Sequence, residues 1–116
     1  METRIVKDKI NMDEIRVLAH EQYQDIIKAV IDVQQEIMGI GGELHVDIQS
    51  ILIEKEGSLG AETWGINLYP NKTGNDFIEF DSMINLKPNF GNRSRDIENE
   101  KVKSKIREII KKLIQN

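Results

Sequence analysis

The chain has 116 residues and a mass of 13.4 kDa, so we expect residues 1–116 to form a single domain. Hydrophobic residues make up 39% and charged residues 31%, as in an ordinary globular protein. The chain contains no cysteine, which excludes disulfides, thiolate catalysis and cysteine-ligated zinc or iron–sulfur centres. The absence of cysteine also fits a reducing cytoplasm.

Charge is unevenly distributed. Residues 1–86 carry 7 Lys and Arg against 16 Asp and Glu, whereas residues 87–116 carry 9 against 4. The acidic body argues against nucleic acid as a partner, while the basic end can meet phosphate, an acidic partner or the acidic body itself. No apolar run approaches the roughly 18 residues that span a bilayer, so we expect no membrane partner. The first residues lead into a strand rather than a signal peptide, which predicts a cytoplasmic location.

The first elements are a short strand and a long helix. Residues 3–7 alternate in polarity and predict the strand. Asn11 is a candidate N-cap with Glu14 three residues later, as in a capping box. Apolar residues then recur every three or four positions up to Met38, and Gly39 follows as a stop signal. The pattern predicts one helix across residues 12–38.

Residues 43–55 admit two interpretations. Apolar residues alternate from Leu44 to Ile48 and again, in the opposite phase, from Ile51 to Ile53, which is typical of a strand with a β-bulge. A helix is the alternative, because four apolar residues also fit its spacing: Leu44, Ile48, Ile51 and Leu52. We favour the strand because β-branched residues dominate the segment.

The second half predicts two strands and a helix. Residues 63–69 and 77–87 have the pattern of strands, each ended by a proline, and a basic amphipathic helix capped by Asp96 or Asn99 closes the chain. We therefore expect an α+β fold in two layers. A mostly antiparallel sheet would carry both helices on one face, in the order β-α-β-β-β-α.

A hairpin between these two strands would gather polar side chains on one face. If Tyr69 lies opposite Phe77, Asn67 faces Glu79 and Gly65 faces Asp81. The other face is then apolar and can receive the helices. Glycine within a strand often marks close approach by a ligand or another backbone. The pattern thus predicts a polar face centred on a spot without a side chain.

Four strings in the chain resemble those of a small prokaryotic family, a domain of unknown function. They are Gly41-Gly42-Glu43-Leu44-His45, Trp64-Gly65-Ile66-Asn67-Leu68-Tyr69-Pro70, Phe77-Ile78-Glu79-Phe80-Asp81-Ser82-Met83-Ile84-Asn85 and Gly91-Asn92-Arg93-Ser94-Arg95. The resemblance extends from about Met12 to Leu113 and implies no activity. Lys87 stands where the family pattern has Arg, which argues against a role there that needs a planar guanidinium.

The polar face and the loop that follows it favour a binding or interaction module. Asn, Tyr and Arg side chains are prone to such contacts, and the partner would be a ligand, another protein or a second copy of the chain. The residues predicted to bind are Asn67, Tyr69, Glu79, Asp81, Asn85, Arg93 and Arg95.

Two alternatives stay open, so whether the protein is an enzyme is undecided. One is a hydrolase of phosphate-containing substrates, with Mg²⁺ or Mn²⁺ as its only cofactor and Arg93 and Arg95 as phosphate clamps. Its metal ligands would be Glu79, Asp81, His45 and Glu43. In the other, the arginines pair with the two strand carboxylates and the cluster is purely structural.

Overall fold

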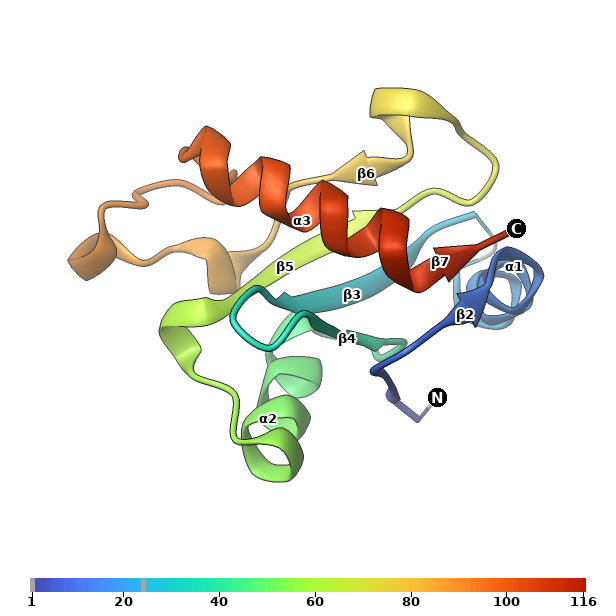
Figure 1. Ribbon diagram of the computed structural model, residues 1–116, viewed down its shortest axis with the longest axis horizontal. Helices are drawn as coiled ribbons and strands as arrows, with labels where there is room; N and C mark the ends of the chain where they lie inside the picture. Colours follow the sequence, from blue (N-terminus) through green and yellow to red (C-terminus); the bar gives the residue numbers. More distant parts are fainter. Residues whose placement is uncertain (1, 24) are drawn as a thin grey trace.

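The computed structural model describes residues 2–23 and 25–116 and has an α+β architecture (Figure 1). A five-stranded antiparallel sheet has the order β1-β4-β3-β5-β6, and a short parallel pair joins β2 to β7. The strands are β1 (Arg4–Val6), β2 (Ile10–Asn11), β3 (Ile27–Asp32), β4 (Ile37–Ile40), β5 (Thr63–Leu68), β6 (Ile78–Glu79) and β7 (Ile114–Gln115). The helices are α1 (Met12–Gln22), α2 (His45–Glu56) and α3 (Glu100–Leu113).

The helix ends follow local signals in the sequence. The Asn11 side chain accepts a hydrogen bond from the Asp13 amide at 2.7 Å, and Asn99 does the same for the Lys101 amide at 2.8 Å. Helix α2 ends at Gly57, whose φ of 68° closes the last turn. In the part of the chain described, no helix is both long and apolar enough to cross a bilayer.

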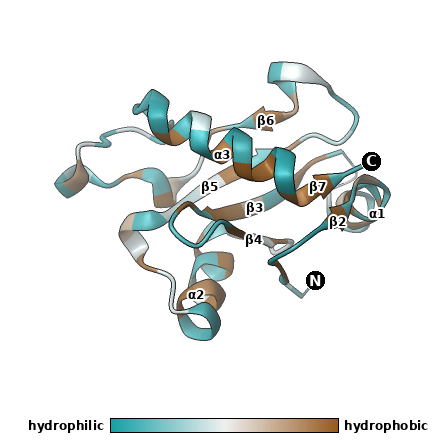
Figure 2. Ribbon diagram, in the orientation of Figure 1, coloured by the Kyte–Doolittle hydropathy of each residue, from teal (hydrophilic) through white to brown (hydrophobic). Residues whose placement is uncertain are grey.

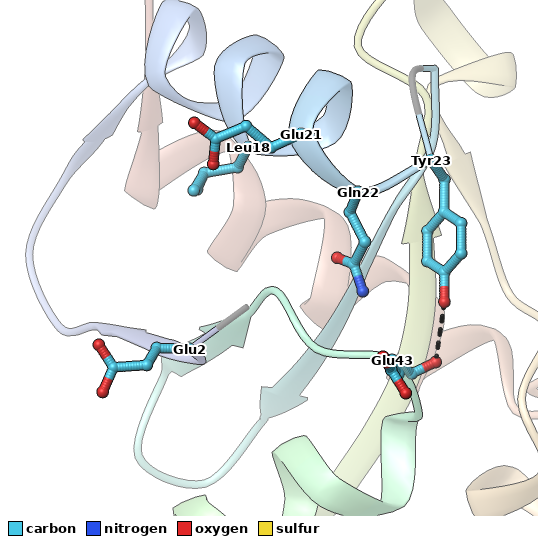
Figure 3. A pocket seen from close by; sticks show the side chains of 6 residues that line it. All are labelled: Glu2, Leu18, Glu21, Gln22, Tyr23 and Glu43. Atoms are coloured by element: carbon cyan, nitrogen blue, oxygen red, sulfur yellow. Dashed lines mark hydrogen bonds between the residues drawn. The ribbon is translucent and has the colours of Figure 1, made fainter.

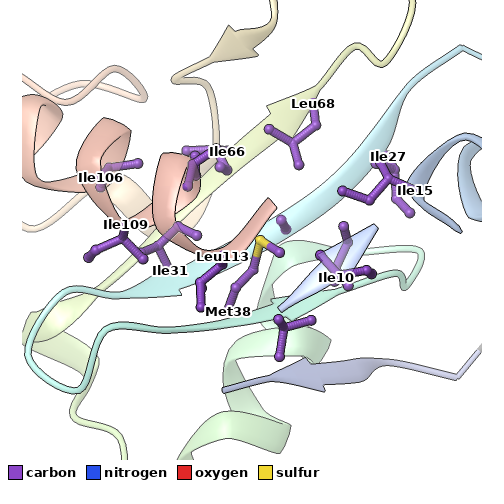
Figure 4. Packing of buried hydrophobic residues seen from close by; sticks show 14 of the residues in the cluster. Ile10, Ile15, Ile27, Ile31, Met38, Ile66, Leu68, Ile106, Ile109 and Leu113 are labelled. Atoms are coloured by element: carbon purple, nitrogen blue, oxygen red, sulfur yellow. The ribbon is translucent and has the colours of Figure 1, made fainter. Parts of the chain in front are cut away.

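Helices α1 and α3 cover one face of the sheet. Ile106, Ile109 and Leu113 of α3 pack over Ile31 and Ile66 (Figure 4). Figure 2 shows the apolar residues of α3 turned toward the sheet and its hydrophilic residues turned outward. The predicted last helix and the predicted apolar face of β5 are therefore confirmed.

Helix α2 covers the opposite face, so the sheet lies between two layers of helix instead of having both predicted helices on one side. Ile48 and Leu52 pack against Val30 and Ile37, which point away from α3. This contact is close at Gly39, where a Cβ atom would come within 2.6 Å of Ile48 Cγ2. Gly39 is thus not the helix stop predicted from the sequence but the strand position on which α2 rests.

The predicted helix over residues 12–38 ends at Gln22, and the prediction is wrong for residues 25–38; residue 24 lies outside the described residues. The chain turns at Tyr23 and continues as the hairpin of β3 and β4. Every residue from Ala29 to Asp32 and from Ile37 to Ile40 is buried, because helices cover both faces of these strands. A strand buried on both faces has no alternation of polarity, so its apolar run is also compatible with helical spacing.

The two other predicted strands also change. Residues 45–56 form α2, so the favoured strand over residues 43–55 is wrong and the helical alternative holds. Among the described residues, the predicted strand 77–87 pairs with β5 only at Ile78 and Glu79, after which a 3₁₀ turn forms over Met83–Asn85 and Lys87 bridges to Asn92. The element order accordingly differs from the predicted β-α-β-β-β-α, while the α+β class and the mostly antiparallel sheet are confirmed.

Gly39→Ala tests the packing of α2. The new methyl group would overlap Ile48, so we expect a loss of about 1–3 kcal/mol in the free energy of unfolding, measured by urea denaturation. Gly60→Ala is the matched control, since a Cβ atom there meets nothing within 4 Å. Equal stabilities of the two variants would show that α2 does not rest on β4 at Gly39.

Candidate functional site

The predicted register of β5 and β6 is confirmed. Asn67 pairs with Glu79, and the Tyr69 amide donates to the Phe77 carbonyl oxygen at 2.9 Å. Asn67 Nδ2 donates to Glu79 Oε1 at 2.9 Å, and the Tyr69 hydroxyl donates to the same oxygen at 3.0 Å. Burial and the Glu79 carboxylate raise the pKa of Tyr69, so the hydroxyl keeps the proton it donates. Glu79 thereby fixes two of the predicted side chains.

The spot without a side chain at Gly65 is filled from within the chain. A Cβ atom on Gly65 would lie 2.6 Å from Ser82 Cβ and 3.1 Å from His45 Cδ2. The predicted pairing of Gly65 with Asp81 does not form. Instead, Asn85 Oδ1 accepts from the Gly65 amide at 2.8 Å and Asn85 Nδ2 donates to the Gly65 carbonyl at 2.9 Å. The Asn85 amide therefore replaces a missing strand partner, and its role is structural.

The loop after β6 is tied to the start of α3. Asn92 Nδ2 donates to the Asn85 carbonyl at 2.7 Å and to the Asp96 carbonyl at 2.8 Å. Arg95 Nε donates to Asp81 Oδ1 at 2.7 Å, and both side chains remain about half exposed. Arg93 is exposed and bonds Glu98 only through its backbone amide. One of the two predicted arginines thus reaches a strand-end carboxylate.

A pocket of about 420 Å³ opens where the start of α2 faces β5 and this loop. Its volume lies in the range of small-molecule sites. We call it the α2–β5 pocket and define it by its lining residues, which are Lys28, Leu44, His45, Val46, Asn67, Asp81, Ser82, Met83, Ile84 and Arg95. It therefore brings together four predicted site residues, the candidate metal ligand His45 and the predicted binding residues Asn67, Asp81 and Arg95, with six residues that were not predicted as site residues.

Asn67, one of the residues that line this pocket, carries an unpaired acceptor. The residue is only 6% exposed, and its Nδ2 is turned toward Glu79 Oε1 and, at 3.3 Å, the Asp81 carbonyl oxygen. These two acceptors fix the orientation of the amide. Asn67 Oδ1 is buried and has no hydrogen-bond partner among the described residues. A buried carbonyl oxygen without a donor is costly, so this atom calls for a group from outside the chain.

His45 occupies the first turn of α2 and is 9% exposed. Its Nε2 lies 2.8 Å from the Ile66 carbonyl oxygen. A carbonyl can only accept, so Nε2 carries the proton and Nδ1 is an acceptor in the neutral ring. Burial is the largest effect and lowers the pKa of His45. The hydrogen bond to Ile66 opposes it, the Lys28 charge lowers the pKa further, and smaller effects of Asp81 and Asn67 raise it. The ring is therefore neutral at pH 7.

The lining contains two cationic side chains, Lys28 and Arg95, and one carboxylate, Asp81. Lys28 is half-buried and forms no ion pair within residues 2–23 and 25–116, although its ammonium lies 5.2 Å from the Tyr23 ring centroid. Arg95 uses only Nε on Asp81. Leu44 caps α2 without a side-chain hydrogen bond, so the first amides of the helix add the positive end of its dipole. The pocket suits an anionic group.

The four candidate metal ligands do not all converge on one point, although His45 and Asp81 both line the α2–β5 pocket. Glu79 is bound by Asn67 and Tyr69, and Asp81 by Arg95. Glu43 borders a separate open hollow of about 600 Å³ with Glu2 and Glu21, and Figure 3 shows these three carboxylates lying apart from one another. In the described parts of the chain no three His, Asp or Glu side chains converge as metal ligands. The geometry gives metal-assisted hydrolysis no support.

Lys28 and the start of α2 could not be recognised as pocket residues from the sequence, because the helix predicted around Lys28 and the strand predicted around Val46 are both wrong. Lys28 falls inside the predicted long helix, and Val46 inside the favoured strand. Lys87 also behaves differently from a site residue, since its ammonium lies 4.9 Å from the Trp64 ring centroid and donates to the Ile84 carbonyl at 2.8 Å. Burial lowers the pKa of Lys87. Leu44 offers no side-chain capping signal for the helix start.

His45→Gln tests the buried neutral imidazole. Unfolded His45 takes up a proton near pH 6.5, whereas the folded residue takes it up only at lower pH, so acid favours the unfolded state. We expect the free energy of unfolding of the wild type to fall as pH drops below 6.5, and to fall less steeply in the variant. Urea denaturation between pH 7.5 and 5 measures this. His20→Gln, on the exposed side of α1, is the matched substitution for comparison. An unchanged slope in His45→Gln would contradict the assignment.

Asn85→Asp tests the amide that completes β5. The carboxylate keeps the shape of the side chain but cannot donate to the Gly65 and Arg95 carbonyls, so a buried charge would face two oxygens. We expect a loss of about 3 kcal/mol in the free energy of unfolding. Asn89→Asp, on an exposed turn, is the matched control. Tolerance of Asn85→Asp at pH 7 would refute the structural role of Asn85.

Comparison with known proteins identifies the chain at the family level. No curated protein and no solved structure matches it. The family model described as Protein of unknown function (DUF5674) matches residues 4–113, nearly the whole chain, as the resemblance of the four sequence strings implied. The protein therefore belongs to the DUF5674 family.

Proposed function

We propose that this protein binds a small molecule in the α2–β5 pocket. The observation that carries the proposal is Asn67 Oδ1, a buried acceptor without a partner among the described residues, in the lining of a concave space of about 420 Å³. A site with a few fixed polar groups among apolar walls is the usual form of a ligand pocket. Binding rather than hydrolysis is favoured because the nearby carboxylates are already paired.

Five of the seven residues predicted to bind fall into two groups. Asn67, Asp81 and Arg95 line the pocket and can contact a ligand. Tyr69 and Glu79 act through Asn67, because Glu79 accepts from both of the other side chains and so fixes the amide. A rigid amide supports selective binding, since a preorganised acceptor loses little freedom when a ligand arrives.

Val46→Trp tests the site whatever the identity of the ligand. Val46 lies at the pocket and is 48% exposed, so an indole there can fill the entrance without disturbing the core. The wild type would be screened by thermal shift and ¹⁵N NMR against amino acids, hydroxy acids, sugars, sugar phosphates, nucleotides and polyamines. We expect at least one class to raise Tm and to move the resonances of Leu44, His45 and Asn67, because a ligand that binds only the native state stabilises it.

The matched control is Val17→Trp, on the exposed side of α1 at 57% exposure. It should retain every response of the wild type, whereas Val46→Trp should lose them. The proposal fails if no compound moves the pocket resonances, or if binding persists unchanged in Val46→Trp.

A further inference from the structure

We propose that the ligand is a small organic acid, a carboxylate or a phosphate monoester, that also carries a hydroxyl or amino group. This inference rests on the proposed function and adds the chemistry of the ligand. Three independent features of the lining lead to it: two cationic side chains against one carboxylate, a pair of acceptors that need a donor, and exposed apolar walls.

The acidic group is indicated by the start of α2 and by two cations. The backbone amides of His45 and Val46 have no acceptor within the helix. The N-cap residue, Leu44, has no side-chain acceptor for them. Helix N-termini of this kind bind carboxylates and phosphates. The Lys28 ammonium and the terminal nitrogens of Arg95 are free of carboxylate partners among the described residues, and Asp81 offsets only one charge. The site therefore favours one anionic group over a polyanion.

The donor is indicated by Asn67. Its Oδ1 is buried without a partner, and its Nδ2 cannot exchange places with it because Glu79 Oε1 and the Asp81 carbonyl hold the nitrogen. His45 adds a second acceptor at Nδ1, since Nε2 donates to Ile66. Both atoms accept and neither donates, so a simple anion leaves them unsatisfied. A hydroxyl or an ammonium on the ligand satisfies Asn67 directly.

The remaining surface suits a short aliphatic group. Leu44, Val46 and Met83 line the pocket and are 56%, 48% and 62% exposed, respectively. Three exposed apolar side chains around one opening are unusual for a surface that contacts only water, and they provide apolar contact for the rest of the ligand. The volume of about 420 Å³ limits the ligand to a small molecule.

Paired probes that differ by hydroxyl groups test the inference. The carboxylate arm compares 2-hydroxy-4-methylpentanoate with 4-methylpentanoate, and the phosphate arm compares glycerol 3-phosphate with propyl phosphate. Dissociation constants come from NMR titration of the wild type. In at least one arm we expect the hydroxylated probe to bind about ten- to a hundredfold more tightly, because only it supplies the donor that Asn67 Oδ1 lacks. The arm that responds identifies the acidic group.

Two variants separate the contribution of the Lys28 charge from that of the Asn67 acceptor. Lys28→Gln should weaken both members of a responding pair several-fold, while Lys111→Gln, an equal loss of charge on the exposed side of α3, should not. Asn67→Leu should abolish the preference for the hydroxylated probe. If this variant does not fold, titration of the wild type with the paired probes, together with the Lys28→Gln variant, still tests the proposed ligand class.

The failures can be told apart. If acids bind in the pocket without preference for the hydroxyl group, or if neither arm binds while a neutral or cationic compound from the screen does, the ligand class is wrong and the proposed function stands. If no compound of any class moves the pocket resonances, both proposals fall. Equal weakening by Lys28→Gln and Lys111→Gln would show that the acid is not held in the pocket.

Discussion

The close contact of α2 with the sheet is the constraint on which the rest of the structure depends. Two glycines permit it: Ile48 approaches β4 at Gly39, and His45 with Ser82 approaches β5 at Gly65. Because α2 covers the face opposite α3, the central strand β3 is buried on both sides. The helix also begins directly beside Asn67 and Lys28. A larger side chain at either glycine would move the helix and open this arrangement.

Side-chain amides replace backbone pairing at one end of the sheet. Where the chain leaves β6, Asn85 takes over both hydrogen bonds at Gly65, and Asn92 then holds the Asn85 carbonyl. This substitution lets the loop turn over the sheet instead of running along it. The loop brings Asp81 and Ser82 to the start of α2, so a departure from regular strand pairing creates one wall of the pocket.

The strands and helices that could be predicted from the sequence are those that pack against apolar side chains on one face only, because such packing produces a periodic pattern of apolar and polar residues. Strand β5 alternates because α3 covers one face and polar groups occupy the other. Parity restricts its pairing with β6 to every second register, and the register that places Tyr69 opposite Phe77 is the one that forms. Strand β3 could not be predicted, because burial on both faces removes its alternation. Helix α2 is obscured by its β-branched residues, of which Ile53 lies exposed at 42% and contributes little to packing. Lys28 and His45 meet only through tertiary structure, so local patterns could not bring them together.

The stacking of Lys87 on Trp64 gives the protein a built-in optical reporter. Trp64 is the only tryptophan in the chain, it is 7% exposed, and the ammonium lies 4.9 Å from its ring centroid. Lys87 belongs to the same loop that Asn85 and Asn92 hold against β5. Detachment of that loop would remove a cation from the indole and admit water to it. The fluorescence of this single ring therefore reports on the attachment of the loop that carries Lys87, without any introduced label.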